Sequence, residues 1–142
     1  MPDAQIVSAM LEARQRSVRV VLLLPGAIDN ELVRKAGRAG FGRLLDAGVE
    51  IYEYRSGLLH AKSMTVDGVW ATVGSANLDS RSLGLNEEVN LIVFDRSLVG
   101  RLERIFFDDL AHAQRIDDKR WRTRSPWERF IGFLALRLRA QL

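Results

Sequence analysis

One stretch of the 142-residue chain is almost continuously apolar and rich in β-branched residues: Val18-Arg19-Val20-Val21-Leu22-Leu23-Leu24. Pro25 and Gly26 follow it and end the run. A short apolar run without alternation is typical of a strand that is covered on both faces, because such a strand has no solvent side. The sequence therefore predicts a central strand of an α/β sheet.

The segments on either side of this strand extend the α/β pattern. Residues 3–16 carry apolar side chains at helical spacing, and Asp3 can cap that helix. A second helix is expected from about Asp29 to the stop signal at Gly48, and residues 49–54 have the composition of the next strand. A helix–strand–helix–strand order predicts a parallel pair of strands.

A hairpin is expected next, because residues 58–66 and 69–73 flank an Asp-Gly pair at 67–68 that favours positive φ. Alternation along the first of these strands directs His60 and Lys62 to the same face. Residues 88–94 are predicted to be a further strand, and residues 97–115 a helix with Leu98 and Ile105 among its inward side chains.

Composition limits the class of protein. With 47% apolar and 27% charged residues the chain suits one soluble domain. It has no cysteine, and its two histidines lack paired-ligand spacing, so we expect chemistry without a metal or a cofactor. Residues 96–142 carry 11 basic against 6 acidic side chains, a surplus that alone selects neither nucleic acid nor anionic lipid as a partner.

Two short segments carry the residue types that phosphodiester chemistry needs. His60 offers an imidazole that can attack phosphorus, and Lys62 an ammonium that can hold phosphate oxygens. The loop after the hairpin offers small donors and backbone N–H groups: Gly74-Ser75-Ala76-Asn77-Leu78-Asp79-Ser80-Arg81-Ser82. Because no second copy of these segments exists in the chain, the sequence predicts a half-site.

Each candidate has a structural alternative. A lone His60 is more often a surface histidine and a lone Lys62 a solvated lysine, but together they favour phosphate chemistry. The Asp-Gly turn is enough to account for an aspartate at position 67, so Asp67 has a structural alternative to a catalytic role. Ser75 and Asn77 are either turn formers or phosphate ligands, and we favour the ligands.

Further along the chain, Glu88 is either a rim charge or the acceptor of one His60 N–H, which would fix the imidazole tautomer. Glu87 is expected to face solvent, and His112 to be structural.

The His60-X-Lys62-X4-Asp67 motif, the Gly-Ser-X-Asn loop and the segment 85–90, Leu-Asn-Glu-Glu-Val-Asn, resemble the phospholipase D superfamily, and within it the C-terminal half of bacterial cardiolipin synthases. The resemblance covers most of residues 2–142. It implies one phospholipase D-like half-domain over residues 1–115, a mixed β-sheet flanked by helices. The implied catalytic residues are His60, Lys62, Asp67 and Glu88, and the implied phosphate ligands are Lys62, Ser75 and Asn77.

The resemblance also implies a mechanism in which two such motifs meet at a pseudo-twofold axis. One histidine forms a phosphohistidine and the other protonates the leaving alcohol, so His60 is nucleophile or acid, with Glu88 orienting it. A phosphatidyl group on histidine passes to an alcohol such as phosphatidylglycerol. The family half-domain normally opens with an apolar strand just before the segment that here reads Met1-Pro2-Asp3, with the first motif further upstream. We therefore expect a C-terminal portion, a truncated product or a chain that pairs with a copy of itself.

Residues 116–142 are expected to be a charged linker and an amphipathic C-terminal helix that opens with a Ser125-Pro126-Trp127-Glu128 capping box. At roughly 17 residues with 1.5 Å rise each, this helix is too short to span a bilayer and suits a membrane interface or docking on its own domain. Its apolar and basic character favours a phospholipid over nucleic acid, at the periphery of the bacterial inner membrane. The alternatives are a homodimeric phosphodiesterase or nuclease, and an inactive phosphate-binding fragment.

Overall fold

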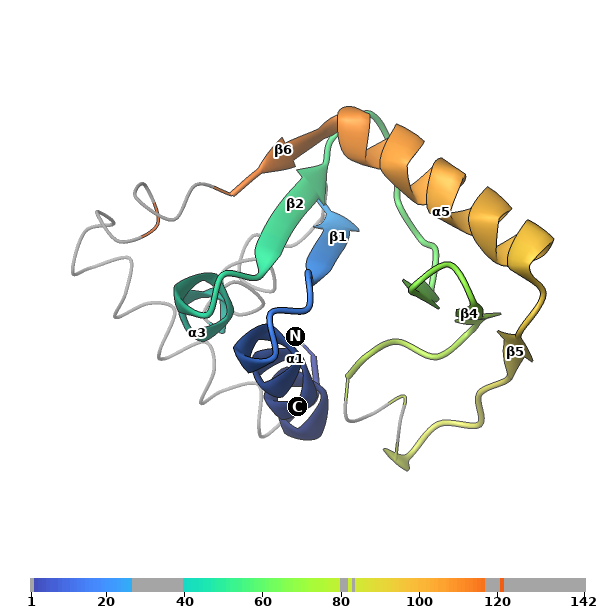
Figure 1. Ribbon diagram of the computed structural model, residues 1–142, viewed down its shortest axis with the longest axis horizontal. Coiled ribbons are helices and arrows are strands. Elements are labelled where there is room, and N and C mark those ends of the chain that lie inside the picture. Colours follow the sequence, from blue (N-terminus) through green and yellow to red (C-terminus); the bar gives the residue numbers. More distant parts are fainter. Residues whose placement is uncertain (1, 27–39, 80–81, 83, 117–120, 122–142) are drawn as a thin grey trace.

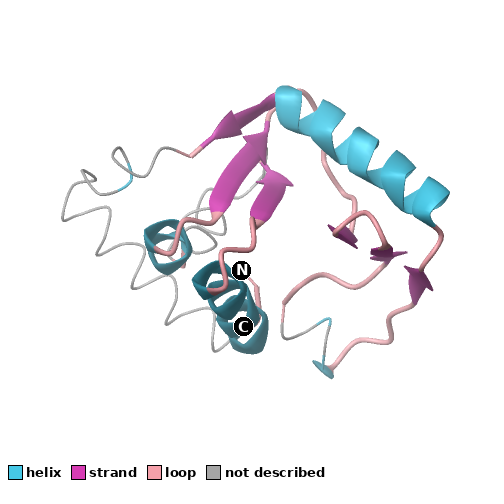
Figure 2. Cartoon of the chain, viewed as in Figure 1, coloured by secondary structure: helices cyan, strands magenta, loops and turns pink. Residues whose placement is uncertain are grey.

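The computed structural model of the protein describes residues 2–26, 40–79, 82, 84–116 and 121. This part forms two three-stranded sheets with helices packed on them, a mixed α/β arrangement (Figures 1 and 2). The expected charged linker and C-terminal helix, residues 116–142, lie outside the described residues apart from Ile116 and Trp121. The ring of Trp121 packs on Phe41 with centroids 5.6 Å apart.

The first sheet has the order β1-β2-β6. β1 (Val21–Pro25) and β2 (Glu50–Tyr54) run parallel, with Leu22 opposite Ile51. The short β6 (Ala113–Arg115) pairs antiparallel with the other edge of β2. The predicted parallel pair is confirmed.

The expectation of a central strand at residues 18–24 is wrong in two respects. The strand begins at Val21, and Val18 is 41% exposed. Within the described part of the chain, β1 is also an edge strand that pairs with β2 alone, and none of its side chains is fully buried. Its apolar side chains from Val21 to Leu24 are half-buried, and Leu22 and Leu24 pack against the core of the first sheet.

Two helices cover one face of this sheet. α1 (Ala4–Gln15) begins as expected at Asp3, whose carboxylate accepts a 2.9 Å hydrogen bond from the Gln5 N–H. Ser17 ends it with φ of 64°. Of the second expected helix, the structure describes α3 (Phe41–Asp46), which Gly48 follows with φ of 82°.

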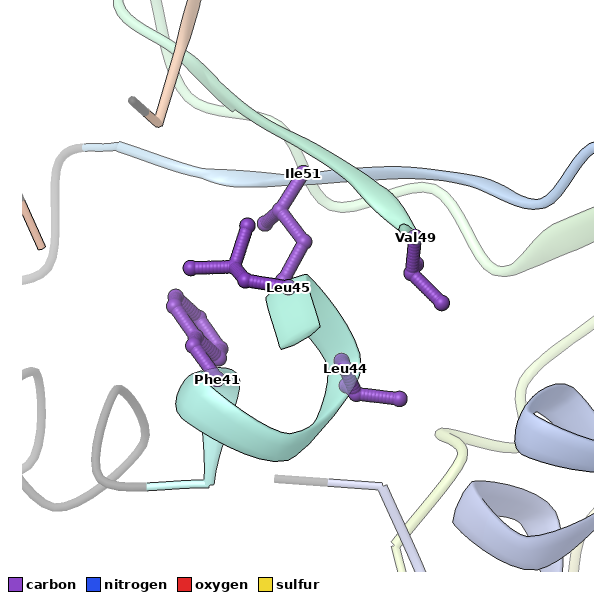
Figure 3. Packing of buried hydrophobic residues seen from close by; sticks show 5 residues of the cluster. All are labelled: Phe41, Leu44, Leu45, Val49 and Ile51. Atoms are coloured by element: carbon purple, nitrogen blue, oxygen red, sulfur yellow. The ribbon is translucent and has the colours of Figure 1, made fainter. Parts of the chain in front are cut away.

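The first sheet and α3 share a compact apolar core. Its buried members are Phe41, Leu44, Leu45, Val49 and Ile51, which Figure 3 shows converging between α3 and β2. Val7, Met10 and Leu11 of α1 and Leu22 and Leu24 of β1 pack against it. Both helices therefore lie on the same face of the first sheet.

The second sheet is antiparallel, in the order β3-β4-β5, with β3 (Ser63–Val66), β4 (Trp70–Gly74) and β5 (Asn90–Val93). The hairpin turn is confirmed: Asp67 and Gly68 have φ of 51° and 66°. β3 begins five residues later than expected, so His60 and Lys62 lie in the loop ahead of it. Among the described strands β5 is at the edge of this sheet, with Leu91 and Ile92 more than half exposed.

α5 (Arg96–Ala111) packs on one face of the second sheet and leads into β6 (Figure 1). Val99 is fully buried against Ala71 and Val93, whereas Leu98 and Ile105 are exposed, so their expected inward placement is wrong. The helix ends at Ala111, because the last residues of the expected helix form β6 instead. Glu103 ties α5 to the hairpin by accepting a 3.0 Å hydrogen bond from the Gly68 N–H.

The core around Ile51 predicts a stability cost. Ile51→Ala removes a side chain with 0% exposure that packs between α3 and the sheet, so the free energy of unfolding should fall by about 2–5 kcal/mol. Chemical denaturation measures it. Leu58→Ala is the control, since Leu58 is 82% exposed, and a loss as large in that variant as in Ile51→Ala would contradict the assigned core.

Candidate phosphodiester site

The candidate site is organised by one row of residues across the second sheet. Gly74 on β4 lies opposite Asn90 on β5, and its N–H donates a 3.0 Å hydrogen bond to the Lys62 carbonyl oxygen just ahead of β3. Three segments that are distant in sequence therefore meet at one end of the sheet: the His60/Lys62 loop, the Ser/Asn loop and the start of β5. The hairpin register brings the first two together.

His60 and Lys62 are in direct contact. The Lys62 Nζ lies 2.7 Å from the His60 Nε2 and also donates to the His60 carbonyl oxygen over 3.3 Å. An ammonium has only donors, so Nε2 accepts and the proton of the neutral ring is on Nδ1. The expected proximity of the two side chains is confirmed, although a loop rather than a strand provides it.

A cavity of about 370 Å³ opens beside this pair. Its lining includes His60, Lys62, Asn77 and Asn90 together with the carboxylate residues Glu53 and Asp79, and the remainder is largely apolar. The Asn77 Nδ2 donates to the Ser82 Oγ over 3.3 Å, which keeps the amide at the rim of the cavity. The structure thus brings together three of the expected residues, an imidazole, an ammonium and an amide.

Ser75 and Glu88 form a separate pair outside the cavity lining. The Ser75 hydroxyl donates to the Glu88 carboxylate and accepts a 3.0 Å hydrogen bond from the Val89 N–H, so it fastens the Ser/Asn loop to the start of β5. Glu88 also accepts from the Asn86 amide over 3.5 Å. In the described part of the chain, no hydrogen bond joins Glu88 to His60. Within the described part of this half-site, Glu88 therefore does not orient His60 by a direct hydrogen bond.

The hydrogen bonds and charges around Glu88 determine the direction in which its pKa is shifted. The hydrogen bond from Ser75 is the largest of the effects that lower the pKa of Glu88 below its ordinary value, and it outweighs desolvation, which acts in the opposite direction. Ser82, Asn86 and the positive charge of Lys62 lower the pKa further. The carboxylate is therefore held in its charged form by these hydrogen bonds and by the nearby Lys62 ammonium.

The remaining candidates lie away from the cavity. Asp67 is in the turn at the far end of β3 from His60. Glu87 is exposed as expected, and His112 ends α5, with its Nδ1 2.9 Å from the Asp108 carbonyl oxygen. Among the described residues, none of the helices is both long enough and apolar enough to cross a bilayer.

Sequence reasoning assigned no role to Gly74 or Asn90. They form a pair without mutual backbone hydrogen bonds, in which strands approach most closely, and a Cβ on Gly74 would overlap the Val89 carbonyl oxygen and the Asn90 amide. The Asn90 Oδ1 accepts from the Ala76 N–H over 3.4 Å. The sequence did contain a signal: Gly74 follows the predicted strand 69–73, and a glycine at a strand end often marks a place where another backbone approaches closely.

Gly74→Ala tests this packing. The added methyl group must displace backbone, so we expect the free energy of unfolding to fall by about 1–3 kcal/mol, with shifted amide resonances in the Ser/Asn loop and the start of β5. NMR and denaturation provide the measurements. Gly84→Ala is the matched control, since nothing lies within 4 Å of its Cβ, and equal effects of the two substitutions would refute the assigned crowding.

Ser75→Ala tests the Ser75–Glu88 pair. Loss of the main donor should raise the pKa of Glu88 toward its ordinary value, which a carboxyl-carbon NMR titration measures directly. Because the folded pKa is depressed, this bond stabilises the fold above the ordinary pKa and the contribution is lost as pH falls through the folded pKa. Ser56→Ala is the control, since the Ser56 hydroxyl bonds the His112 carbonyl and not Glu88. If the titration midpoint of Glu88 is unchanged in Ser75→Ala, the assigned Ser75–Glu88 hydrogen bond is wrong.

Comparison with known proteins places this geometry in a family. Residues 1–110 match the family described as "Cardiolipin synthase, PLD-like domain". Curated relatives named cardiolipin synthase A are 44% identical over 131 residues in Erwinia tasmaniensis and 39% identical over 131 residues in Buchnera aphidicola, in each case 92% of this chain. The chain spans 27% of the length of either relative.

A solved structure adds evidence on the fold. Nuc from Salmonella typhimurium, titled a phospholipase D family member, superposes with a TM-score of 0.72 at 18% identity, covering 82% of this chain and 76% of that one. The likeness shows a shared fold. Together with the match over residues 1–110, it establishes that the chain belongs to the cardiolipin synthase family of phospholipase D-like domains.

Proposed function

We propose that the chain is one catalytic half of a phosphatidyltransferase of the cardiolipin synthase type, which works through a phosphohistidine intermediate. The observation that carries the proposal is the contact between the Lys62 Nζ and the His60 Nε2, both of them lining a cavity that Asn77 also lines. This cavity is lined by a nucleophilic nitrogen, a cation for phosphate oxygens and an amide donor.

In the proposed reaction, a histidine Nε2 attacks the phosphorus of a phospholipid such as phosphatidylglycerol. A P–N bond forms, the P–O bond to the leaving glycerol breaks, and the second histidine donates a proton to the departing oxygen. The hydroxyl oxygen of an acceptor alcohol then attacks the phosphorus: a new P–O bond forms, the P–N bond breaks and frees the first histidine, and the second histidine takes the proton of the acceptor hydroxyl. His60 takes one of these two roles, and Lys62 neutralises the charge that develops on the phosphate oxygens.

Within this proposal, Lys62 and Asn77 bind the phosphate. Ser75, in the same loop as Asn77, is the third phosphate ligand of the proposal, and its hydroxyl also bonds Glu88 and the Val89 N–H. Glu88 supports His60 through the Ser75 loop or reaches the histidine of the second half, and Asp67 maintains the turn that sets the hairpin register.

A single histidine at the site requires a second half, supplied by another part of a longer protein or by a second copy. We propose a phospholipid substrate and peripheral attachment to the inner membrane of a bacterium, with the basic and apolar C-terminal segment at the lipid surface. Nucleic acid is the less favoured substrate.

A homodimeric phosphodiesterase is the second candidate. The fold match covers 82% of this chain and 76% of the solved Nuc chain, so the two chains are of similar length. In such a dimer the two copies of His60 face each other. This candidate requires a dimer, so a strict monomer by light scattering would exclude it.

The decisive experiment is a chimera. The 131 residues of the Erwinia tasmaniensis relative that match this chain are replaced by the corresponding residues of this chain, and cardiolipin formation is measured in phosphatidylglycerol vesicles. We expect the chimera to make cardiolipin and His60→Ala to lower the rate at least about a thousandfold, because loss of a nucleophile or acid removes a whole step.

His112→Ala in the same chimera is the control, since His112 lies at the end of α5 and bonds the Asp108 carbonyl. A folded chimera that makes no cardiolipin, or one in which His60→Ala is as active as the control, would overturn the proposal. Chain 1–142 is assayed alone in parallel with a chromogenic phosphodiester. Cleavage that requires His60, by a chain that light scattering shows to be a dimer, would favour the second candidate.

A further inference from the structure

Ser82, at the end of the Ser/Asn loop, is a buried polar residue that has no role in the reaction described above. It is only 5% exposed. Its N–H donates a 3.0 Å hydrogen bond to the Asp79 carboxylate, and its Oγ accepts the 3.3 Å hydrogen bond from the Asn77 Nδ2. A buried hydroxyl needs a partner for its own proton as well as for its lone pairs.

Glu88 is the partner that takes this proton. The side chains of Ser82 and Glu88 are hydrogen-bonded, and an ionised carboxylate has only acceptors, so the serine donates. A hydrogen bond to an ionised acceptor is roughly twice as strong as one between neutral groups, so the proton stays on the Glu88 side of the Ser82 oxygen. The Ser82 oxygen therefore offers only lone pairs to Asn77.

The direction of this proton determines which end of the Asn77 amide faces Ser82. An amide has a carbonyl oxygen at one end and an NH2 group at the other, and only the NH2 group can bond an oxygen that offers lone pairs. Ser82 therefore uses one N–H of the Asn77 Nδ2, and the second N–H remains for a phosphate oxygen. A flipped amide would put its carbonyl oxygen in that place, where it would repel the phosphate.

Glu88 thus accepts from serines at both ends of the Ser/Asn loop. Ser75 donates to it at the start of the loop and Ser82 at the end, so one carboxylate orders both hydroxyl protons. Ser75 also accepts from the Val89 N–H and fastens the loop to β5. Ser82 instead holds Asn77. Glu88 therefore acts on the phosphate side of the site without touching a reacting atom.

We propose that Ser82 is a positioning residue of the phosphate site: by donating its hydroxyl proton to Glu88, it holds the Asn77 amide with an N–H available to the phosphodiester group of the substrate. The identity of this ligand rests on the proposed function. The hydrogen-bond chain from Glu88 through Ser82 to Asn77 does not depend on the transfer reaction, so residues 1–142 alone are sufficient to test it.

NMR of the chain tests the hydrogen bonds. Ser82→Ala removes the acceptor of the Asn77 N–H, so we expect the Asn77 side-chain NH2 resonances to shift and their exchange with solvent to quicken about fivefold. The same substitution removes one donor to Glu88, so the pKa of Glu88 should rise toward its ordinary value. This rise should be smaller than in Ser75→Ala, because the Ser75 hydrogen bond has the larger effect on Glu88.

Titration with dimethyl phosphate, a phosphodiester monoanion, tests the effect on binding. We expect it to shift the Asn77 NH2 resonances of the unsubstituted chain, and we expect its dissociation constant to rise about tenfold in Ser82→Ala, because a hydrogen bond to a charged group is lost. Ser82→Thr keeps the hydroxyl and should restore most of the affinity. Ser8→Ala is the matched control, since the Ser8 hydroxyl also donates to a carboxylate, that of Glu12 on α1.

A double substitution separates positioning from a purely structural role. In Asn77→Ala there is no amide for Ser82 to hold, so adding Ser82→Ala should not change the dissociation constant further. Equal weakening by Ser82→Ala in both backgrounds would overturn the proposal. So would unchanged Asn77 NH2 resonances in Ser82→Ala, or the absence of any shift of these resonances by dimethyl phosphate in the unsubstituted chain. A chimera that makes no cardiolipin would contradict the proposed function instead, and these readouts would remain valid.

Discussion

The constraint on which this structure depends is the register of the β3–β4 hairpin. One backbone hydrogen bond, from the Gly74 N–H to the Lys62 carbonyl, aligns the His60/Lys62 loop with the Ser/Asn loop. The Asp-Gly turn at the opposite end sets that register, since a slip by one residue would turn every side chain of the strand to the other face. The contact of Glu103 with the Gly68 N–H joins this turn to α5, so the helix also supports the site.

The site divides into a reactive part and a supporting part. His60, Lys62 and Asn77 face the cavity, whereas Ser75 and Glu88 bond each other and hold the loop against β5. The residues proposed to meet the substrate are therefore held in place by contacts made outside the cavity lining.

Features with strong local signals were predictable from the sequence. Asp3 caps α1, Gly48 stops α3 and the Asp-Gly pair makes the turn, because each is decided by the backbone preference of one or two residues. The edge position of β1, the strand β6 and the pairing of Gly74 with Asn90 depend on contacts between distant segments, which periodicity does not encode. The same holds for Glu88, whose partner Ser75 is fixed by the β4–β5 register.

The open edge of β5 has a consequence for the handling of the protein. Leu91 and Ile92 are 63% and 56% exposed on a strand whose outer backbone groups have no partner among the described residues. Such an edge is a template for pairing with another chain, and proteins usually protect it with lysine, proline or a bulge. Without these features on β5, colloidal stability in concentrated solution rests on charge repulsion, so salt should promote reversible filament or amorphous assembly before any loss of helix content.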